Sequence, residues 1–394
     1  MTDKKRAYEA THPWLTFTLD VRRIQPPLWM LLGEAASKCE HIAGVPLPPV
    51  LQEHLHQVYL AKGVLATTAI EGNTLTEEQV RAHLEGKLQL PKSKEYLKQE
   101  ITNILDACND LADRIFKGET EITVEHILSF NRRVLDSIPL DDPEIVPGQI
   151  RKRAVGVGRY PGPPPEDCAF LLGRLCEELA AMRKSGLDGP PIAWAILRAI
   201  FAHIYLVWIH PFYDGNGRTA RLMELQILIA AGVPTPAAHL LSNHYNETRL
   251  EYYRQLDAAS RSGGDLTPFI GYAVQGFVDG LKSQLTNVRE HQLAVSWRDF
   301  VNAHFYGKSR STDQRQRQLA LDLSLNDEAV PLDQLAMLTP ELAKKYAQRG
   351  AKTLTRDVAA LVEAGIIERT EKGVRARREL IHAFLPRRKS APTT

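Results

Sequence analysis

One stretch of the chain, IAWAILRAIFAHIYLVWI (192–209), is apolar on almost every side when it is read as a helix. A helix without a polar face has no surface to turn toward water, so we expect it at the centre of a bundle. His203 lies on this helix, seven residues before His210 and on the same face. We interpret His203 as a hydrogen-bonded core residue and not as a metal ligand.

The neighbouring segments also have helical spacing. In 93–116 the apolar residues recur every three to four positions, which predicts a long amphipathic helix. Segments 123–135, with Thr123 as its N-cap, and 166–185 predict two more helices. Between them, PGQIRKRAVGVGRYPGPPP (147–165) alternates valine with glycine and is bounded by proline, which favours a short hairpin. The fold class expected is all-α with one small hairpin.

The bulk composition limits the classes of protein that remain. A length of 394 residues favours two or three domains. We expect that no apolar run reaches the length needed to span a bilayer, and the start, MTDKKRAYEATHPW, lacks the apolar core of a signal peptide. The four cysteines form no CxxC pair, as expected for buried thiols in a reducing compartment. We therefore expect a cytoplasmic protein that has no contact with a membrane.

The central helix is followed directly by a polar loop, HPFYDGNGRTAR (210–221). Gly215 and Gly217 flank Asn216, so backbone N–H groups can turn inward without obstruction by a Cβ. At the start of the next helix, such a turn makes an anion-binding nest that the helix dipole strengthens. The loop therefore predicts a phosphate-binding site between two apolar helices.

Four charged or titratable side chains of this loop fit the same interpretation. Arg218 and Arg221 are three positions apart on the following helix, so both can reach one anion. Asp214 would repel a phosphate unless a cation lay between them, and Mg²⁺ held by one carboxylate is the usual solution. His210 can accept a proton near neutral pH. The loop thus indicates a nucleotide and a hydroxyl nucleophile as reactants.

The string HPFYDGNGRTAR resembles the signature of the Fic family, H-x-F-x-[D/E]-G-N-G-R-x-x-R, at every specified position. Fic proteins are helical enzymes, mostly adenylyltransferases that move AMP from ATP to a protein hydroxyl. The resemblance implies roles for the following residues: His210 as the base, Phe212 in the core, Asp214 on Mg²⁺, Gly215, Asn216 and Gly217 around the phosphates, and Arg218 and Arg221 on the β- and γ-phosphates.

Two further segments have counterparts in that family. The 147–165 hairpin occupies the place of the family's flap, which aligns the target backbone, and Val155 and Val157 would face the adenine or the target. Segment 239–256 resembles the helix whose aromatic pair encloses the adenine, here Tyr252 and Tyr253. Many relatives place an asparagine four residues before this pair, where the present chain has a threonine.

An upstream segment, ATTAIEGNTLT (66–76), reads locally as a helix end with Gly72 as its left-handed cap. Glu71 would then lie at a helix C-terminus, where the dipole disfavours an anion by roughly 0.3–1 kcal/mol unless a cation is near. Thr67-x-x-x-Glu71-Gly72 also resembles the inhibitory motif of the family, [S/T]-x-x-x-E-[G/N]. The resemblance implies that Glu71 pairs with Arg221 and keeps the γ-phosphate out of its productive place.

The C-terminal end is basic, with thirteen Lys and Arg against six Asp and Glu in residues 341–394. Segment 331–380 contains a short helix, a helix at 353–367 that Thr353 would cap, and a hairpin around Lys372 and Gly373. This order resembles a winged helix-turn-helix. Such a module contacts either DNA or another protein, and the sequence leaves both alternatives open.

These segments define the expected organisation. It comprises an accessory segment at 1–55, a Fic core at 56–305 and a winged-helix domain at 318–386, with a disordered tail at 387–394. The core would hold the inhibitory helix near 62–72, the flap near 147–165 and the loop at 210–221.

The expected activity is AMP transfer from ATP, with Mg²⁺, to a Ser, Thr or Tyr hydroxyl of a target protein or of the chain itself, restrained by Glu71. Two alternatives stay open: removal of AMP by the same site, and a DNA-binding regulator that senses a nucleotide. The intact His210 argues against the regulator, because sensing needs no base. A homodimer is a further alternative for the assembly.

Overall fold

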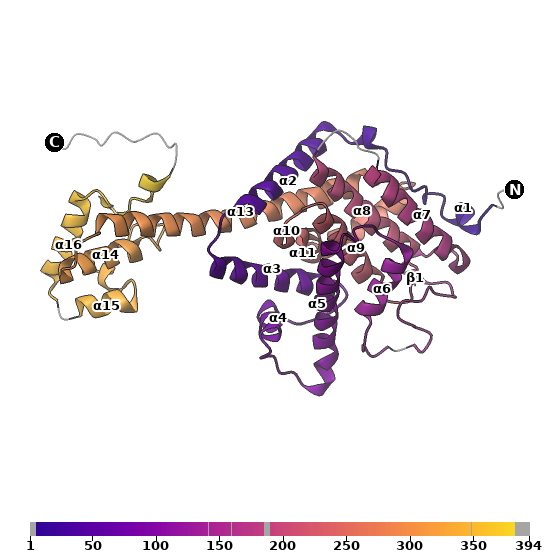
Figure 1. Ribbon diagram of the computed structural model, residues 1–394, viewed down its shortest axis with the longest axis horizontal. Helices are drawn as coiled ribbons and strands as arrows, with labels where there is room; N and C mark the ends of the chain where they lie inside the picture. The colour runs from indigo at the N-terminus through magenta and orange to yellow at the C-terminus, as the bar shows by residue number, and fades with distance from the viewer. Residues whose placement is uncertain (1–4, 141, 159, 185–189, 348, 383–394) are drawn as a thin grey trace. The chain divides into compact units, whose positions relative to one another are not determined.

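The computed structural model describes residues 5–140, 142–158, 160–184, 190–347 and 349–382. The chain forms two compact units, Met1–Leu285 and Thr286–Thr394. Figure 1 labels the elements along the chain. In the first unit they are helices α1 (Ala7–Thr11), α2 (Pro26–Gly44), α3 (Pro49–Ala69), α4 (Glu77–Leu84), α5 (Glu95–Phe116), α6 (Val124–Val134), α7 (Pro165–Lys184), α8 (Pro191–Ile209), α9 (Asn216–Ala230), α10 (Thr235–Ala238), α11 (Leu240–Glu247), α12 (Arg249–Arg261) and α13 (Thr267–His304), with strands β1 (Gly156–Val157) and β2 (Tyr160–Pro161). Helix α13 continues into the second unit. The structure is mostly helical, so the predicted all-α fold class is confirmed.

Helix α8 lies at the centre of the first unit, as its apolar sequence predicted. It packs against α9, α7 and α2, and nearly all of its side chains are buried. Among the described residues, α8 alone is long and apolar enough to cross a bilayer by length and composition. The expectation that no apolar run reaches this length was therefore wrong. However, 83% of that window is buried inside the protein, where a core helix has the same composition as a membrane span.

The N-terminal segment is part of the core and not an accessory, which corrects the prediction for residues 1–55. Leu15, Phe17 and Leu32 are at most 3% exposed, and Phe17 stacks on Tyr205 of α8 at a ring separation of 4.7 Å. Helix α2 covers one side of α8. The sequence pattern did not reveal this packing because its contacts join segments far apart along the chain.

The predicted helices around α8 form with small shifts at their ends. Thr123 caps α6 as expected, because its Oγ1 accepts a hydrogen bond from the N–H of His126 at 3.2 Å. The single helix expected at 239–256 is instead two helices, α11 and α12, which meet at Thr248. Thr248 leaves the helical conformation with φ −116° and ψ 39°, so the chain bends there.

The second unit has its own core. Its elements are α14 (Ser311–Leu323), α15 (Pro340–Tyr346), α16 (Ala351–Glu363), β3 (Ile367–Thr370) and β4 (Gly373–Ala376). Strands β3 and β4 form an antiparallel hairpin, and Val330 makes an isolated bridge to Val374. On α16, Leu354, Val358 and Leu361 are buried as predicted. The N-cap of α16 is Gly350 and not Thr353, which lies one turn inside the helix.

The boundary between the units differs from the predicted one near residue 305. The C-terminal part of α13 belongs to the second unit, because Trp297, Val301 and Phe305 are buried in its core. A polar linker therefore does not mark this boundary; a continuous helix crosses it. The tail predicted at 387–394 lies outside the described residues.

Candidate active site

The polar loop joins the two central helices and turns through left-handed backbone conformations at both of its ends. His210 ends α8 with φ 44° and ψ 58°, and Gly215 begins α9 with φ 80°. A Cβ at residue 215 would lie 2.8 Å from Asn131 Nδ2, so both the conformation and the space require glycine. Asn216 closes the loop by hydrogen bonds to the N–H and C=O of Phe212. The first turn of α9 therefore has a fixed place beside His210.

His210 is half-buried, and hydrogen bonds hold both its backbone N–H and its backbone C=O. Its N–H donates to Leu206 O at 2.9 Å, and its C=O accepts from Arg151 Nε at 2.8 Å. Burial lowers the pKa of His210 to about 4, so its imidazole is neutral at neutral pH. Nδ1 lies 3.4 Å from Val207 O, a contact that favours the tautomer with a proton on Nδ1. That tautomer leaves Nε2 with a lone pair, as a general base requires.

A cavity of about 490 Å³ opens beside this histidine. It brings together seven of the residues that the sequence analysis selected, namely Glu71, Val157, His210, Asn216, Gly217, Tyr252 and Tyr253. Val155, on the same hairpin as Val157, does not line it; its C=O accepts the N–H of Gly162 at 2.9 Å. The hairpin thus presents one of its two predicted valines to the cavity.

Glu71, which lines this cavity, forms an ion pair with the buried Arg221. Arg221 Nη2 donates to Glu71 Oε1 at 2.5 Å and to Thr67 O at 2.9 Å. Burial disfavours the charged form of Glu71, but Arg221, Arg218 and Arg249 outweigh it and hold the pKa of Glu71 below its usual value. Thr67 contacts Arg221 through its backbone carbonyl only, since its hydroxyl donates a hydrogen bond to Gly63 O. Gly72 has φ 108°, the left-handed region predicted for it.

The Glu71 carboxylate also lies against the start of α9. A Cβ at residue 217 would overlap Glu71 Oε1, so only glycine lets this carboxylate approach the helix N-terminus so closely. The position favours an anion, because the helix dipole and unpaired N–H groups meet there. Glu71 therefore lies where the loop is suited to hold a phosphate oxygen.

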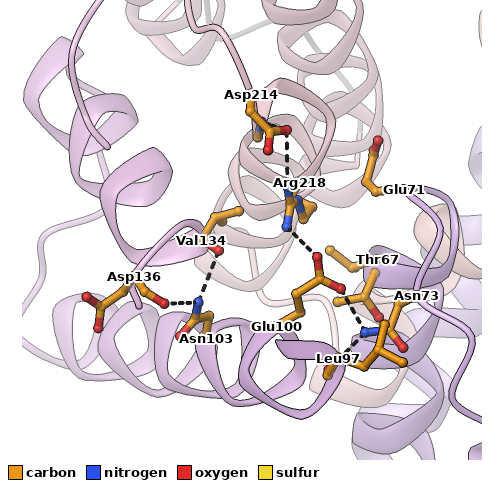
Figure 2. Close-up of polar contacts among 12 residues, drawn as sticks. Thr67, Glu71, Asn73, Leu97, Glu100, Asn103, Val134, Asp136, Asp214 and Arg218 are labelled. Atoms are coloured by element: carbon orange, nitrogen blue, oxygen red, sulfur yellow. Dashed lines mark hydrogen bonds and ion pairs between the residues drawn. The ribbon is translucent and has the colours of Figure 1, made fainter. Parts of the chain in front are cut away.

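Arg218 makes two ion pairs (Figure 2). Its Nη2 lies 3.2 Å from Asp214 Oδ1, and its Nη1 lies 3.2 Å from Glu100 Oε1. The Arg218 side chain is only 5% exposed, whereas that of Asp214 is 46% exposed and can reach a solvated cation. Within the described part of the chain, no three His, Cys, Asp or Glu side chains gather as a metal cluster. A single carboxylate that shares Mg²⁺ with phosphates needs no such cluster.

The two tyrosines have different environments. Tyr252 is 2% exposed and its hydroxyl lies 2.9 Å from His203 Nε2, whereas Tyr253 is 41% exposed at the cavity mouth. His203 Nδ1 lies 3.2 Å from Glu224 Oε2, and both side chains are buried. The interpretation of His203 as a core residue is confirmed, because its side chain is buried and hydrogen-bonded to the hydroxyl of Tyr252.

The sequence analysis missed three residues that shape the site. Asn131 donates to Asp214 O at 2.8 Å and accepts from the N–H of Gly148, which ties α6 to the loop. Arg151 reaches His210 O and Pro163 O from the hairpin segment. Glu100 pairs with Arg218. Glu100 could have been found, because it interrupts the apolar stripe of α5 at the position three after Leu97.

The fold and site together define a helical bundle whose two central helices are joined by a glycine-bounded loop. Residues 121–228 match the model of the Fic/DOC family. This part of the chain is therefore similar to the Fic/DOC family, as the resemblance of its signature implied.

Curated relatives support the same family. The chain is 34% identical over 233 residues to a protein named protein adenylyltransferase fic-1 from Caenorhabditis briggsae, covering 57% of this chain and 42% of that protein. It is 29% identical over 256 residues to protein adenylyltransferase Fic from Nematostella vectensis, covering 65% and 55%. The chain thus spans about half the length of the curated relatives it matches.

Solved structures have the same fold. Fic-1 (residues 134–508) from C. elegans aligns with a TM-score of 0.53 and 29% identity, over 67% of this chain and 74% of that one. A Fic family protein from Desulfovibrio desulfuricans aligns with a TM-score of 0.54 over 89% of this chain and 93% of that one. At 21% identity, the second likeness concerns the fold alone.

Proposed function

We propose that this chain is a protein adenylyltransferase that moves AMP from ATP to a Ser, Thr or Tyr hydroxyl and is restrained by its own Glu71. One observation supports this proposal most: a single cavity holds a neutral histidine, the glycine-bounded start of α9 and the Glu71 carboxylate paired with Arg221. The names of the curated relatives point to the same activity. The target protein is a hydroxyl-bearing partner, and the chain itself is a second target.

In the proposed reaction, Nε2 of His210 accepts the proton of the target hydroxyl. The hydroxyl oxygen then forms a bond to the α-phosphorus of ATP, and the bond from that phosphorus to the bridging oxygen breaks. AMP stays on the target, and the electron pair leaves with pyrophosphate. The first turn of α9 and the two arginines stabilise the charge on the phosphates. Tyr252 and Tyr253 enclose the adenine, and Val157 contacts the adenine or the target.

The residues around Asp214 fit a magnesium ion. The carboxylate of Asp214 is half exposed and stands one helical turn before Arg218, so a cation there would lie between it and the phosphates. Mg²⁺ would neutralise charge that develops on the leaving group. Asp214 would hold the ion, and Asn131 would keep the backbone of Asp214 in place through its carbonyl.

The proposed restraint acts through competition for one guanidinium. Arg221 is buried and its Nη2 is already held by Glu71 and Thr67. A γ-phosphate that needs Arg221 must therefore displace a charge-assisted bond, of a kind typically worth ~1.5–3 kcal/mol. That amount corresponds to roughly one to two orders of magnitude in binding.

The test uses wild type and Glu71→Gly, each incubated with ATP and Mg²⁺ and followed by intact-mass spectrometry. We expect at least tenfold faster gain of one AMP mass by Glu71→Gly. Glu53→Gly is the control, since Glu53 is an exposed residue of α3, the helix that ends just before Glu71. If Glu71→Gly transfers AMP no faster than wild type, Glu71 is only a helix-end residue and the restraint is wrong.

Removal of AMP from a modified protein is the second candidate activity. It is favoured by the position of Glu71, whose side chain is 33% exposed in the cavity that also holds His210. A carboxylate there can orient an attacking water. Incubation of an AMP-modified substrate with wild type and Glu71→Gly separates the two activities, because removal needs Glu71 and transfer does not.

The second unit is proposed as a docking module of the winged-helix type. Arginines in and just after its hairpin already pair with carboxylates: Arg375 with Glu368, and Arg378 with Asp327 at 2.7 Å. This pairing favours a protein partner over DNA, because DNA phosphates would have to displace those carboxylates. A homodimer is one form of such contact, and the cytoplasm is the proposed compartment.

A further inference from the structure

A row of polar contacts connects the metal-binding position to α5 (Figure 2). It runs from Asp214 through Arg218 to Glu100, and from Glu100 to Asn73. Glu100 uses a different oxygen for each partner: Oε1 accepts from Arg218 Nη1 at 3.2 Å, and Oε2 accepts from Asn73 Nδ2 at 2.8 Å. Asn73 thereby fixes one oxygen of the Glu100 carboxylate, and the other oxygen holds the guanidinium of Arg218.

Asn73, one partner of Glu100, is itself held by further hydrogen bonds. Asn73 is 6% exposed, its Nδ2 also donates to Leu97 O at 2.9 Å, and its Oδ1 accepts the N–H of Leu75. Glu100 is thus anchored to the backbone of two segments by one amide group. A rigid anchor reduces the conformational entropy that Arg218 must lose to bind a phosphate.

Burial makes the two charges depend on each other. The side chains of Glu100 and Arg218 are 15% and 5% exposed. Burial raises the pKa of Glu100, while Arg218 and Asn73 act against that rise. An isolated charge at either position would be costly, so each side chain needs the other. Arg218 also stands in the first turn of α9, where the helix dipole disfavours a cation and a carboxylate partner offsets that effect.

We infer that Glu100 is a positioning residue that holds Arg218 in its phosphate-binding orientation when Asp214 turns to the metal. This inference rests on the function proposed above, in which Mg²⁺ competes with Arg218 for the Asp214 carboxylate. Glu100 lies on the opposite end of the guanidinium and keeps Nη1 in place. Nη2 and the unpaired Nε of Arg218 are then free to donate to phosphate oxygens.

The experiment compares Glu100→Ala with its parent in the Glu71→Gly background, where the restraint is absent. Arg218 contacts phosphates before and during the reaction, so we expect the KM for ATP to rise about tenfold while kcat changes less than threefold. Glu95→Ala, an exposed glutamate on the same helix, is the matched control and should change neither constant. Unchanged KM in Glu100→Ala would overturn the inference.

The conservative variant Glu100→Gln tests whether Glu100 acts by its hydrogen bond to Arg218 or only by filling space. Its one amide oxygen can still accept from Arg218, while Asn73 keeps its bond to Leu97 O, so most of the lost ATP affinity should return. This variant also serves if Glu100→Ala does not fold. A KM in Glu100→Gln that equals that of the parent or lies between the parent and Glu100→Ala supports the inference; a KM above that of Glu100→Ala contradicts it.

A double-mutant cycle with Arg218→Ala identifies the route of the effect. If Glu100 acts through Arg218, the double variant should bind ATP no more weakly than Arg218→Ala alone. Additive losses would place the action of Glu100 elsewhere. Calorimetric titration with ATP separates this inference from the proposed function. A Glu71→Gly protein that binds ATP but transfers no AMP refutes the transferase, whereas the affinity comparison still decides the role of Glu100.

Discussion

Arginines pair with carboxylates in two regions of this molecule, and the two groups differ mainly in burial. In the loop region, the side chains of Arg218 and Arg221 are 5% and 1% exposed. In the hairpin of the second unit and the two residues after it, called the hairpin region below, those of Arg375, Arg377 and Arg378 are 38%, 35% and 27% exposed. The partner atoms are of the same kind in both regions.

The difference in burial predicts where substitutions matter. An exposed ion pair contributes about 0–1 kcal/mol, because water replaces the lost partner. Removing one member of a buried pair leaves an uncompensated charge and costs roughly 3–5 kcal/mol. A buried arginine therefore strongly requires an anion, whether carboxylate or phosphate. The loop region is suited to exchange one for the other, whereas the hairpin region is suited to solvated contact with a partner surface.

The largest effect is expected for the base in the loop region. His210→Ala in the Glu71→Gly background should lower AMP transfer by about 10²–10⁴-fold, the usual loss for a general base, with little change in ATP affinity. His54→Ala, an exposed histidine on α3, is the control. Transfer of radiolabelled AMP is the measurement, and full activity would remove His210 from the mechanism.

Loss of the metal should have the next largest effect. Asp214→Ala, or EDTA with the unmodified site, should lower transfer at least tenfold and weaken ATP binding, because the carboxylate and the phosphates share the cation. Asp279→Ala, an exposed carboxylate on α13, should have no effect. Titration with ATP in the presence and absence of Mg²⁺ measures the change. Transfer that continues unchanged in EDTA would contradict the magnesium assignment.

The buried pair itself gives the sharpest contrast with the hairpin region. Arg221→Ala breaks the contact with Glu71 but removes the phosphate contact as well, so it should not activate, and its rate should stay at least tenfold below that of Glu71→Gly. Arg378→Ala also breaks an ion pair, with the exposed Asp327, and should leave transfer unchanged. Activation by Arg221→Ala to the level of Glu71→Gly would show that Arg221 holds no phosphate.

The smallest effect on transfer is expected for the hairpin region. Replacement of Arg375, Arg377 and Arg378 together by alanine should change AMP transfer less than about twofold, as for exposed ion pairs generally. If the unit contacts DNA, the DNA affinity of the same variant should depend less strongly on salt. The slope of log affinity against log salt concentration should be smaller by up to ~3, about one for each arginine removed. A mobility-shift assay at low salt checks this, and the absence of any shifted complex with the unmodified chain would favour the protein partner.

The corrections to the predicted fold have one physical cause. The packing of the N-terminal segment and the α13 boundary both depend on contacts between segments distant in sequence. Local spacing reports which face of a helix is apolar, but it does not report what covers that face. The long helix α13 shows this most clearly, because its two ends are buried in different cores.

The amino-acid sequence by itself determined the central apolar helix, the glycine-bounded loop and the chemistry of His210, Asp214, Arg218 and Arg221, because these features are local in the chain. Tertiary structure alone decided which carboxylates meet those arginines. Glu71 and Glu100 lie 150 and 118 residues before their partners. A motif resemblance could suggest the first contact, but only the packing of α5 against α9 brings Glu100 to Arg218. Ion pairs between distant segments depend on the three-dimensional placement of helices, which spacing along a chain does not specify.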